Sequence, residues 1–248
     1  MSSAAHRWIR RLARFTTFTS EEQRALEEVS VSTRRCAAND DLHKPGDSAG
    51  RLFVVLEGLV CQHKILADGR RQILAYLFAG DMADPRQLLQ AHMDHALCVI
   101  WPSEVAILTS NSMQRLDQFP NITQAMARYA STQQAIGREW LVNVGHRTAS
   151  ERLGHLLCEL YIRLEAVGLT RDQAFELPLT QAELGDTLAL SAVHVNRTLM
   201  ELRRLKLVTF QNRQVVIHDF AALRIAAGFD ARYLQINEDT QVRIAGTA

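Results

Sequence analysis

Ser, His, Asn and Arg side chains stand close together in the run LSAVHVNR, which covers residues 190–197. Side chains of these types could ligate a metal, support a catalytic centre, bind DNA or face water. His194 has no second ligand at helical spacing, which argues against a metal site. The chain contains no P-loop or H-E-x-x-H motif, so we do not expect an enzyme such as a hydrolase or transferase.

Helix-start signals surround this run. Residues 148–151 (TASE) and 180–183 (TQAE) match the capping box, in which Thr accepts from the backbone and Glu reaches back. They predict a helix that ends at Gly168 and a short helix to about Leu188. After a break at 189–190, Ser191 caps a third helix to about Lys206. The stretches LVTFQ and QVVIHD then flank residues 212–213 as a hairpin. Two helices joined by a tight turn and followed by a hairpin form a winged helix-turn-helix.

The second helix of such a motif enters the major groove of DNA. Arg197 could donate two hydrogen bonds to guanine, and Asn196 could pair with adenine or with phosphate. Between residues 191 and 213 there are five basic residues and one acidic residue, so positive charge is concentrated where phosphates would lie. The alternative is a solvated charged helix face. The predicted DNA-binding residues are Ser150, Thr180, Gln181, Ser191, Val193, His194, Asn196, Arg197, Arg203, Lys206 and Arg213.

The first half of the chain has the pattern of a β-structure. Short apolar runs between residues 39 and 108 alternate with glycine-containing turns, which predicts a small antiparallel sandwich or barrel. Asp68-Gly69 indicates a hairpin with a type I′ turn. Residues 51–58 are predicted to form a strand that ends in a turn at Gly58.

A long helix is predicted after Pro120. Seven residues there, most of them apolar, follow one another at spacings of four and three, which is the pattern of a helix that pairs with another helix. The alternative is a helix that packs on its own domain. The predicted dimer-interface residues are Ile122, Met126, Tyr129, Gln133, Ile136, Trp140 and Asn143.

Composition narrows the class of protein. The chain has 248 residues, 47% hydrophobic and 22% charged, with a net charge of +1, which fits one large or two small globular domains. Its four scattered cysteines fit a reducing cytoplasm and argue against a disulfide framework or a cysteine-rich metal site. Arginines interrupt the N-terminal segment, so no signal peptide is expected, and no apolar stretch is long enough for a membrane span.

The order of β-roll, long helix and winged helix-turn-helix resembles the Crp/Fnr superfamily of bacterial transcription regulators. The motif LTQAELGDTLALSAVHVNRTLMELRRLKLV carries the resemblance most specifically, and four β-roll glycines support it. It implies an α+β fold with a jelly-roll domain similar to cyclic-nucleotide-binding domains at 1–119, a dimerisation helix at 120–145 and a DNA-binding domain with a C-terminal tail at 146–248. The implied partners are double-stranded DNA, a second copy of the chain and RNA polymerase.

The sequence departs from the family pattern in places that matter for specificity. Val193 stands where the recognition helix usually has Glu, while Arg197 keeps the arginine position. In the β-roll, Pro85 replaces the ribose-binding Glu, and Met93 and Asp94 replace the Arg-Ser pair that holds the cyclic phosphate, so cyclic AMP binding is not expected.

Other effectors stay open. The single early cysteine, Cys36, does not make an iron–sulfur cluster, and we expect no cofactor. His92 or His95 beside Cys98 leaves a haem-sensing or other small-ligand regulator as an alternative. A second alternative is a ligand-binding module that does not bind DNA.

Overall fold

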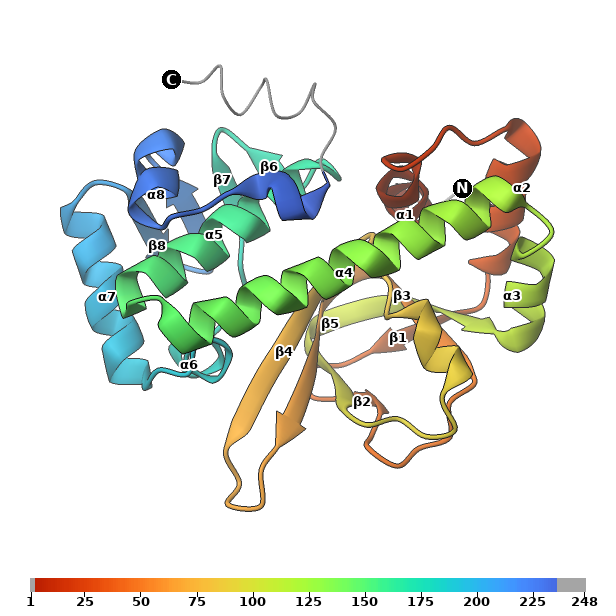
Figure 1. The fold of residues 1–248 in the computed structure, drawn as a ribbon, viewed down its shortest axis with the longest axis horizontal. Helices are drawn as coiled ribbons and strands as arrows, with labels where there is room; N and C mark the ends of the chain where they lie inside the picture. The colour runs from red at the N-terminus through yellow and green to blue at the C-terminus, as the bar shows by residue number, and fades with distance from the viewer. Residues whose placement is uncertain (1–2, 236–248) are drawn as a thin grey trace. The chain divides into compact units, whose positions relative to one another are not determined.

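The computed structural model describes residues 3–235, without the side chains of residues 3–6. The described chain divides into two compact units, and Figure 1 labels most of their helices and strands. The first contains the chain up to Lys64 together with Ile73–Gln134, and the second contains Ile65–Gln72 and the chain from Ala135 onward. Both contain helices and a sheet, which confirms the predicted α+β class.

The first unit is built on a five-stranded sheet. Its strands follow the order β1-β5-β3-β4, and β2 pairs with β5 outside this path. The pairs of β5 with β1, β2 and β3 are antiparallel, as predicted. The strands are β1 (Thr33–Cys36), β2 (Asp41–His43), β3 (Arg51–Ile65), β4 (Arg71–Phe78) and β5 (Ala96–Thr109). The helices are α1 (Ser3–Ala13), α2 (Ser20–Val29), the 3-10 helix η1 (Pro85–Leu89) and α3 (Ser110–Leu116).

Gly58 lies inside β3, so the prediction of a strand ending there is wrong. Its φ is +92°, and the register between β3 and β5 shifts on both sides of it. A Cβ at this position would lie 2.3 Å from Ser103 Oγ, which accepts a hydrogen bond from the Leu59 N–H. The glycine therefore forms a bulge where two strands approach closely.

The Asp68-Gly69 hairpin is present, but its turn differs from the predicted type. Only Gly69 has a positive φ, +85°, whereas a type I′ turn needs two such residues. The Gly69 N–H donates to the Leu66 carbonyl, and the Leu66 N–H donates to the Arg70 carbonyl. A longer connection with one left-handed glycine explains this pattern.

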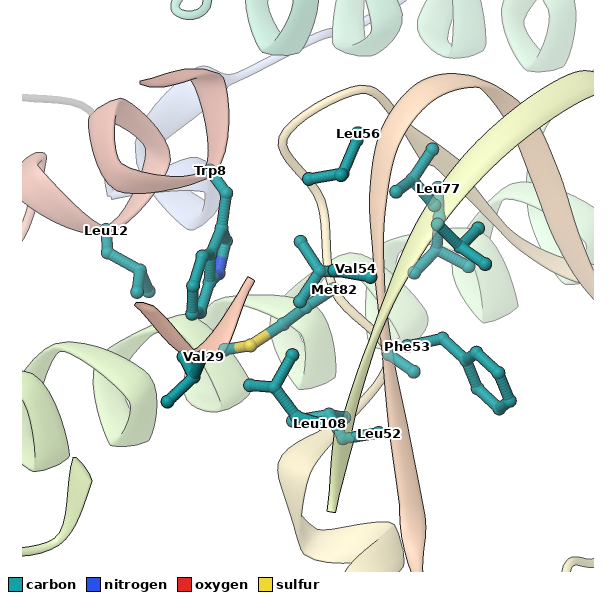
Figure 2. Close-up of a cluster of buried hydrophobic side chains, with 14 of the residues drawn as sticks. Trp8, Leu12, Val29, Leu52, Phe53, Val54, Leu56, Leu77, Met82 and Leu108 are labelled. Carbon is teal, nitrogen blue, oxygen red and sulfur yellow. The ribbon is translucent and has the colours of Figure 1, made fainter. Parts of the chain in front are cut away.

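The core of the first unit includes the N-terminal helices as well as the sheet. Figure 2 shows Trp8 and Leu12 of α1 and Val29 of α2 beside Met82 and Leu108. All five side chains are buried. Helix α1 is thus part of the domain, because its apolar face completes a core that the sheet leaves open.

A buried ion pair also joins α1 to the sheet domain. Arg11 Nε lies 3.0 Å from Asp81 Oδ1, and both side chains are buried. Asp81 Oδ2 accepts from the Phe78 N–H, which fixes the carboxylate. A Cβ at Gly80 would lie 2.9 Å from the Arg7 carbonyl oxygen. The glycine before the carboxylate therefore lets the helix backbone come close.

One long helix, α4 (Pro120–His146), continues from the first unit into the second. It begins and ends within one residue of the predicted range, 120–145. The boundary between the two compact units falls within this helix, after Gln134. The second unit contains α5 (Ala149–Glu165), β6 (Thr170–Arg171), β7 (Ala174–Glu176), α6 (Gln181–Leu188), α7 (Ala192–Arg204), β8 (Val208–Gln211), β9 (Gln214–Ile217), α8 (Phe220–Ala226) and the 3-10 helix η2 (Ala231–Leu234). The four-stranded sheet has the order β6-β7-β9-β8. Of the DNA-binding domain and C-terminal tail predicted at 146–248, residues 236–248 lie outside the described residues.

Within residues 3–235, no helix has both the length and the apolar character needed to cross a membrane.

Candidate nucleic-acid interface

The turn from α6 to α7 passes so close to Gly185 of α6 that this position cannot hold a side chain. A Cβ there would lie 2.5 Å from the Leu190 carbonyl oxygen. The Leu190 N–H donates to the Gly185 carbonyl at 3.1 Å, and Ala189 adopts a left-handed conformation with φ +54°. The predicted break at residues 189–190 is confirmed, and its tight geometry sets the direction in which α7 leaves α6.

Helix α7 is oriented by its cap and by one buried face. Ser191 is the N-cap, and its Oγ accepts from the His194 N–H at 3.2 Å. Val195, Thr198 and Leu202 are the buried side chains of the helix. The helix ends at Arg204, and the Leu205 side chain that follows is 47% exposed.

The opposite face of α7 is open and carries the side chains that could contact DNA. Val193 is 81% exposed, and Asn196 and Arg197 are also exposed. Met200, which the sequence interpretation overlooked, adds a second exposed apolar side chain on this face. Arginine and asparagine with apolar neighbours offer both hydrogen bonds and methyl contacts to base edges.

The predicted wing is present as the β8–β9 hairpin. Asn212 and Arg213 both have positive φ angles, 51° and 64°, as a type I′ turn requires. The Leu177 N–H donates to the Arg213 carbonyl at 2.7 Å, so the wing tip is tied to the chain just after β7. The side chains at the tip, residues 211–214, are exposed.

Exposed positive charge lies along α7 and the wing. The basic side chains are exposed and surround a single acidic residue, Glu201. Such a distribution suits phosphate contacts, which supply affinity without reading sequence. These residues are Arg197, Arg203, Arg204, Lys206 and Arg213.

The other predicted DNA-binding residues differ in what their side chains can offer. The Thr180 hydroxyl accepts from the Glu183 N–H and donates to its carboxylate, so its hydrogen-bonding capacity is used by the capping box. Ser191 Oγ accepts only one bond and can still donate. Gln181 is exposed, while Ser150 and His194 are half-buried.

Arg152, which the sequence did not single out, supports the motif from behind. Its guanidinium donates to the Leu188 carbonyl at the end of α6 and to the Arg147 carbonyl. The Arg152 carbonyl accepts from Asn143 Nδ2 at 3.1 Å. A short chain of hydrogen bonds therefore runs from the end of α4 through α5 to the turn before α7.

The predicted dimer seam needs correction. Six of its seven side chains are buried in the single chain, and Gln133 is half-buried. Ile122, Met126 and Tyr129 belong to the core of the first unit, and Trp140 donates to Glu159 of α5. The four-and-three spacing was read correctly as an apolar stripe, but the stripe packs within the chain, which was the alternative interpretation.

Different side chains stand at the positions where the resemblance to the Crp/Fnr superfamily implies contacts with a cyclic nucleotide. Met93 is buried. Asp94 Oδ2 lies 3.1 Å from Lys64 Nζ, and its Oδ1 lies 2.8 Å from His95 Nδ1. The contacts with His95 and Lys64 lower the pKa of the Asp94 carboxyl to about 2, so this position carries a negative charge. Arg86 pairs with Asp84.

The histidines considered as haem ligands are engaged or exposed. His95 Nε2 lies 3.2 Å from Gln87 Nε2, and its other ring nitrogen faces Asp94. His92 is exposed. Among residues 3–235 no group of three His, Cys, Asp or Glu side chains is placed to hold a metal ion.

One motif that the sequence interpretation overlooked is GDSAG at residues 46–50, which has the spacing of a hydrolase nucleophile elbow. An elbow joins a strand to a following helix. Here the segment joins β2 to β3, and Ser48 forms a β-bridge with His92. The geometry is therefore that of a loop between strands.

Two known protein-domain families match this chain, one in each half. A cyclic nucleotide-binding domain matches residues 33–118, and a Crp-like helix-turn-helix domain matches residues 151–225. Together these define a sensor-like domain joined to a DNA-binding domain. The chain belongs to the Crp/Fnr family of transcription regulators, which are DNA-binding proteins and not enzymes.

Individual relatives agree with this assignment. The chain is 27% identical to the transcriptional activator protein FnrL of Cereibacter sphaeroides over 222 residues, and this alignment covers 86% of each chain. It is 27% identical over 189 residues to the nitrogen fixation regulation protein FixK of Azorhizobium caulinodans, 76% of each chain. The solved structure of FixK2 from Bradyrhizobium japonicum shares the fold, with a TM-score of 0.70 and 22% identity over 79% of this chain and 96% of that one.

Proposed function

We propose that the protein binds an inverted-repeat DNA site as a homodimer and regulates transcription from it in the cytoplasm. The observation that supports this most directly is the open face of α7, where Val193, Asn196 and Arg197 are exposed just after the Ser191 cap. The N-terminal turns of a recognition helix are the part that reaches base edges. RNA polymerase would be the further partner of such a regulator.

Each exposed side chain suits a particular contact. Arg197 would donate two hydrogen bonds to a guanine, and Val193 would contact a thymine methyl group because it cannot hydrogen-bond. Asn196 would pair with adenine or with phosphate. The phosphate contacts would come from the remaining predicted residues whose side chains can donate a hydrogen bond: Ser150, Gln181, Ser191, His194, Arg203, Lys206 and Arg213.

The dimer contact would use a second stripe on α4. Positions 127, 131, 134, 138, 141 and 145 follow one another in steps of four and three, and all six residues are exposed in the single chain. Leu141 in this stripe is 70% exposed and is its one large apolar side chain. A second copy of α4 would cover it, as in a coiled coil. Two-fold symmetry would then place two recognition helices about 34 Å apart, one turn of DNA.

The effector would not be a cyclic nucleotide. The cyclic phosphate would meet a negative Asp94 and a methionine that donates no hydrogen bond. The signal that such a regulator senses would therefore act through other residues.

Selection of bound DNA from a random pool with the full chain tests the proposal. We expect an enriched inverted repeat whose half-sites contain a guanine, and we expect Arg197→Ala to lose the preference for that guanine. An enriched sequence without two-fold symmetry would reject the dimer. A pool that shows no enrichment, with equal binding to all DNA, would reject sequence-specific recognition.

A further inference from the structure

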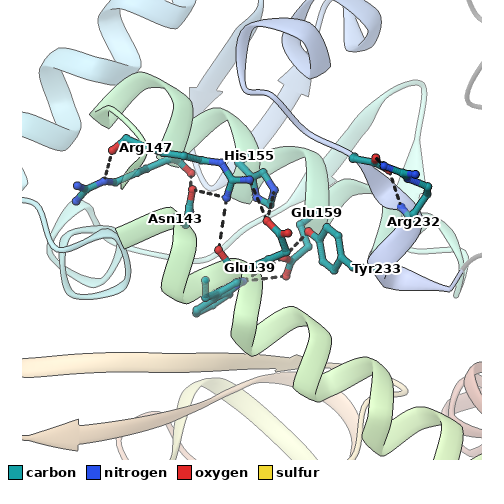
Figure 3. Close-up of polar contacts among 10 residues, drawn as sticks. Glu139, Asn143, Arg147, His155, Glu159, Arg232 and Tyr233 are labelled. Atoms are coloured by element: carbon teal, nitrogen blue, oxygen red, sulfur yellow. Dashed lines mark hydrogen bonds and ion pairs between the residues drawn. The ribbon is translucent and has the colours of Figure 1, made fainter. Parts of the chain in front are cut away.

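A fully buried carboxylate joins three elements of the second unit. The Glu159 side chain on α5 is 0% exposed. Trp140 Nε1 of α4 donates to both of its oxygens, at 3.2 and 3.1 Å. The Tyr233 hydroxyl of η2 donates to Oε2 at 2.8 Å, and Arg163 Nη1 donates to Oε1 at 3.1 Å. Figure 3 shows Tyr233 pointing at this carboxylate from the C-terminal segment.

Aromatic contacts hold Tyr233 in place. Its ring stacks on His155 of α5 with a centroid distance of 6.0 Å and an interplanar angle of 12°. Phe229 packs edge-on against the same histidine at 4.9 Å. Asp230 caps η2 by accepting from the Arg232 N–H and from its guanidinium. The segment 229–234 therefore has one defined position across α5.

The chemistry of this cluster is costly if its only purpose is stability. Removing a carboxylate and a guanidinium from water carries a large penalty, and well-packed apolar side chains often stabilise as well or better. Hydrogen bonds differ from apolar contacts in that they require a narrow range of distances and directions. A carboxylate bound by Trp140 and Tyr233 therefore restricts how α4 and α5 lie against each other more than a leucine would.

The relation between α4 and α5 matters for DNA binding in the proposed dimer. Helix α4 would hold the two copies together, and α5 carries the hydrogen bond from Arg152 to the turn before α7. A small rotation between these helices would change the separation of two recognition helices. It would leave each recognition helix itself intact.

We infer that Tyr233 is a positioning residue, which by clamping Glu159 against Trp140 sets the half-site separation that the dimer accepts. The inference rests on the proposed dimer and adds a residue outside the helix-turn-helix to the determinants of specificity. The sequence between residues 229 and 234 gives no local sign of this role, since its partner lies on α5.

The test uses the full chain and a set of DNA duplexes. Each duplex carries two selected half-sites in inverted orientation with a different number of base pairs between them, and a further duplex carries one half-site. Tyr233→Phe removes one hydroxyl and keeps the ring that stacks on His155. Tyr161→Phe is the matched control, because its hydroxyl donates to the Glu165 carboxylate within α5 and joins no second element. Trp140→Phe removes the donor on the other side of Glu159.

We expect the unaltered protein and Tyr161→Phe to favour one spacing sharply. Tyr233→Phe and Trp140→Phe should accept neighbouring spacings and lose about tenfold in affinity at the favoured one, the loss that corresponds to one buried hydrogen bond. Their affinity for the single half-site should change by less than about twofold, because the recognition helix is unaltered.

Three results would overturn the inference. If Tyr233→Phe weakens the single half-site and every spacing by one common factor, the residue only stabilises the fold. If Tyr233→Phe keeps the sharp spacing preference and the affinity of the unaltered protein, the clamp has no role in positioning. If the unaltered protein itself shows no spacing preference, the proposed dimer fails and the inference fails with it.

Discussion

Arg152 and Leu188 connect the back of the DNA-binding motif to its turn, since Arg152 Nη1 donates to the Leu188 carbonyl oxygen at 2.9 Å. The last carbonyls of a helix have no partner within it, so this bond satisfies one of them at the end of α6. The same guanidinium donates to the Arg147 carbonyl, between α4 and α5. The Arg152 side chain therefore ties the connection between α4 and α5 to the end of α6, just before α7 begins.

Replacing this arginine should loosen the motif. We expect Arg152→Met to lower the free energy of unfolding by about 1–3 kcal/mol, because two charge-assisted hydrogen bonds are lost and two carbonyls are left without that donor. Arg152→Lys should recover only part of this, since an ammonium lacks the planar arrangement of donors. The control is Arg171→Met, an exposed residue paired with Asp172, which should change stability by less than about 0.5 kcal/mol. Chemical denaturation followed by circular dichroism measures all three, and equal effects of Arg152→Met and Arg171→Met would contradict the prediction.

Arg197 is expected to read a base. Arg197→Ala should cost about 1–3 kcal/mol on the selected site and much less on random DNA, because the bidentate contact exists only where the guanine exists. Arg203→Ala should weaken both kinds of DNA alike and reduce the salt dependence, as a phosphate contact does. Competition binding at several salt concentrations separates the two. A common loss on both DNAs for Arg197→Ala would make it a phosphate contact.

The exposed stripe on α4 predicts different outcomes for two apolar residues. Leu141→Glu should give a folded monomer, because the charge enters the proposed interface between copies. Ile136→Glu should instead disrupt folding, since Ile136 is buried within its own chain. Ile225→Glu is the control, because Ile225 on α8 is 78% exposed and lies outside the stripe. Sedimentation velocity and circular dichroism measure assembly and folding, and a Leu141→Glu variant that stays dimeric would rule out this stripe.

His155 should make stability depend on pH. Burial and the nearby Arg147 guanidinium lower the pKa of His155 from 6.5 to about 3, although Glu139 Oε2 lies 3.5 Å from its ring. The unfolded chain therefore binds a proton that the folded chain does not, so this contribution is present above pH 6.5 and is lost as pH falls toward 3.

His155→Phe removes that dependence and keeps a ring between Phe229 and Tyr233. Between pH 7 and pH 5 we expect the unaltered protein to lose about 2 kcal/mol more than the variant. Burial also lowers the pKa of His43, to about 4, and its contribution remains in both proteins. His92→Gln, at an exposed position, should follow the unaltered protein. Identical pH profiles for His155→Phe and the unaltered protein would show that His155 is not held neutral by the fold.

Cyclic nucleotides should not bind. Titration calorimetry with cyclic AMP and with cyclic GMP should give no saturable heat at micromolar concentration, because Met93 and the ionised Asp94 cannot neutralise a phosphate. A saturable micromolar signal would contradict this. If Arg86→Ala then abolished that signal, Arg86 would have left Asp84 to serve as the phosphate partner.

The features that were predicted correctly are those that depend on neighbouring residues. Both capping boxes, the Ser191 cap and the break before it formed as expected, because a cap is decided within four residues. The wing turn at residues 212–213 has the same local origin. The exposed positions of α7 agree with its helical period, because Val195 and Leu202 are buried on the opposite face.

Three features that were missed depend on residues far apart in the sequence. The stripe through Ile122 and Ile136 has the period of a partner helix, and period alone cannot say whether the partner is a second copy or the same chain. Gly58 had the appearance of a turn, but it is required by the approach of Ser103 from another strand. Tyr233 gave no local signal, because its partner Glu159 is 74 positions away along the chain.

The hydrogen bond between Tyr233 and Glu159 can form only late in the synthesis of the chain. During synthesis the chain leaves the ribosome from its N-terminus, so the complete helix-turn-helix and its wing emerge before residue 233. Until then Glu159 and Trp140 have no tyrosine hydroxyl beside them, and the relation of α4 to α5 is set by fewer bonds. A nascent regulator with a finished recognition helix would thus be a poor competitor for its own operator until its C-terminal segment is made.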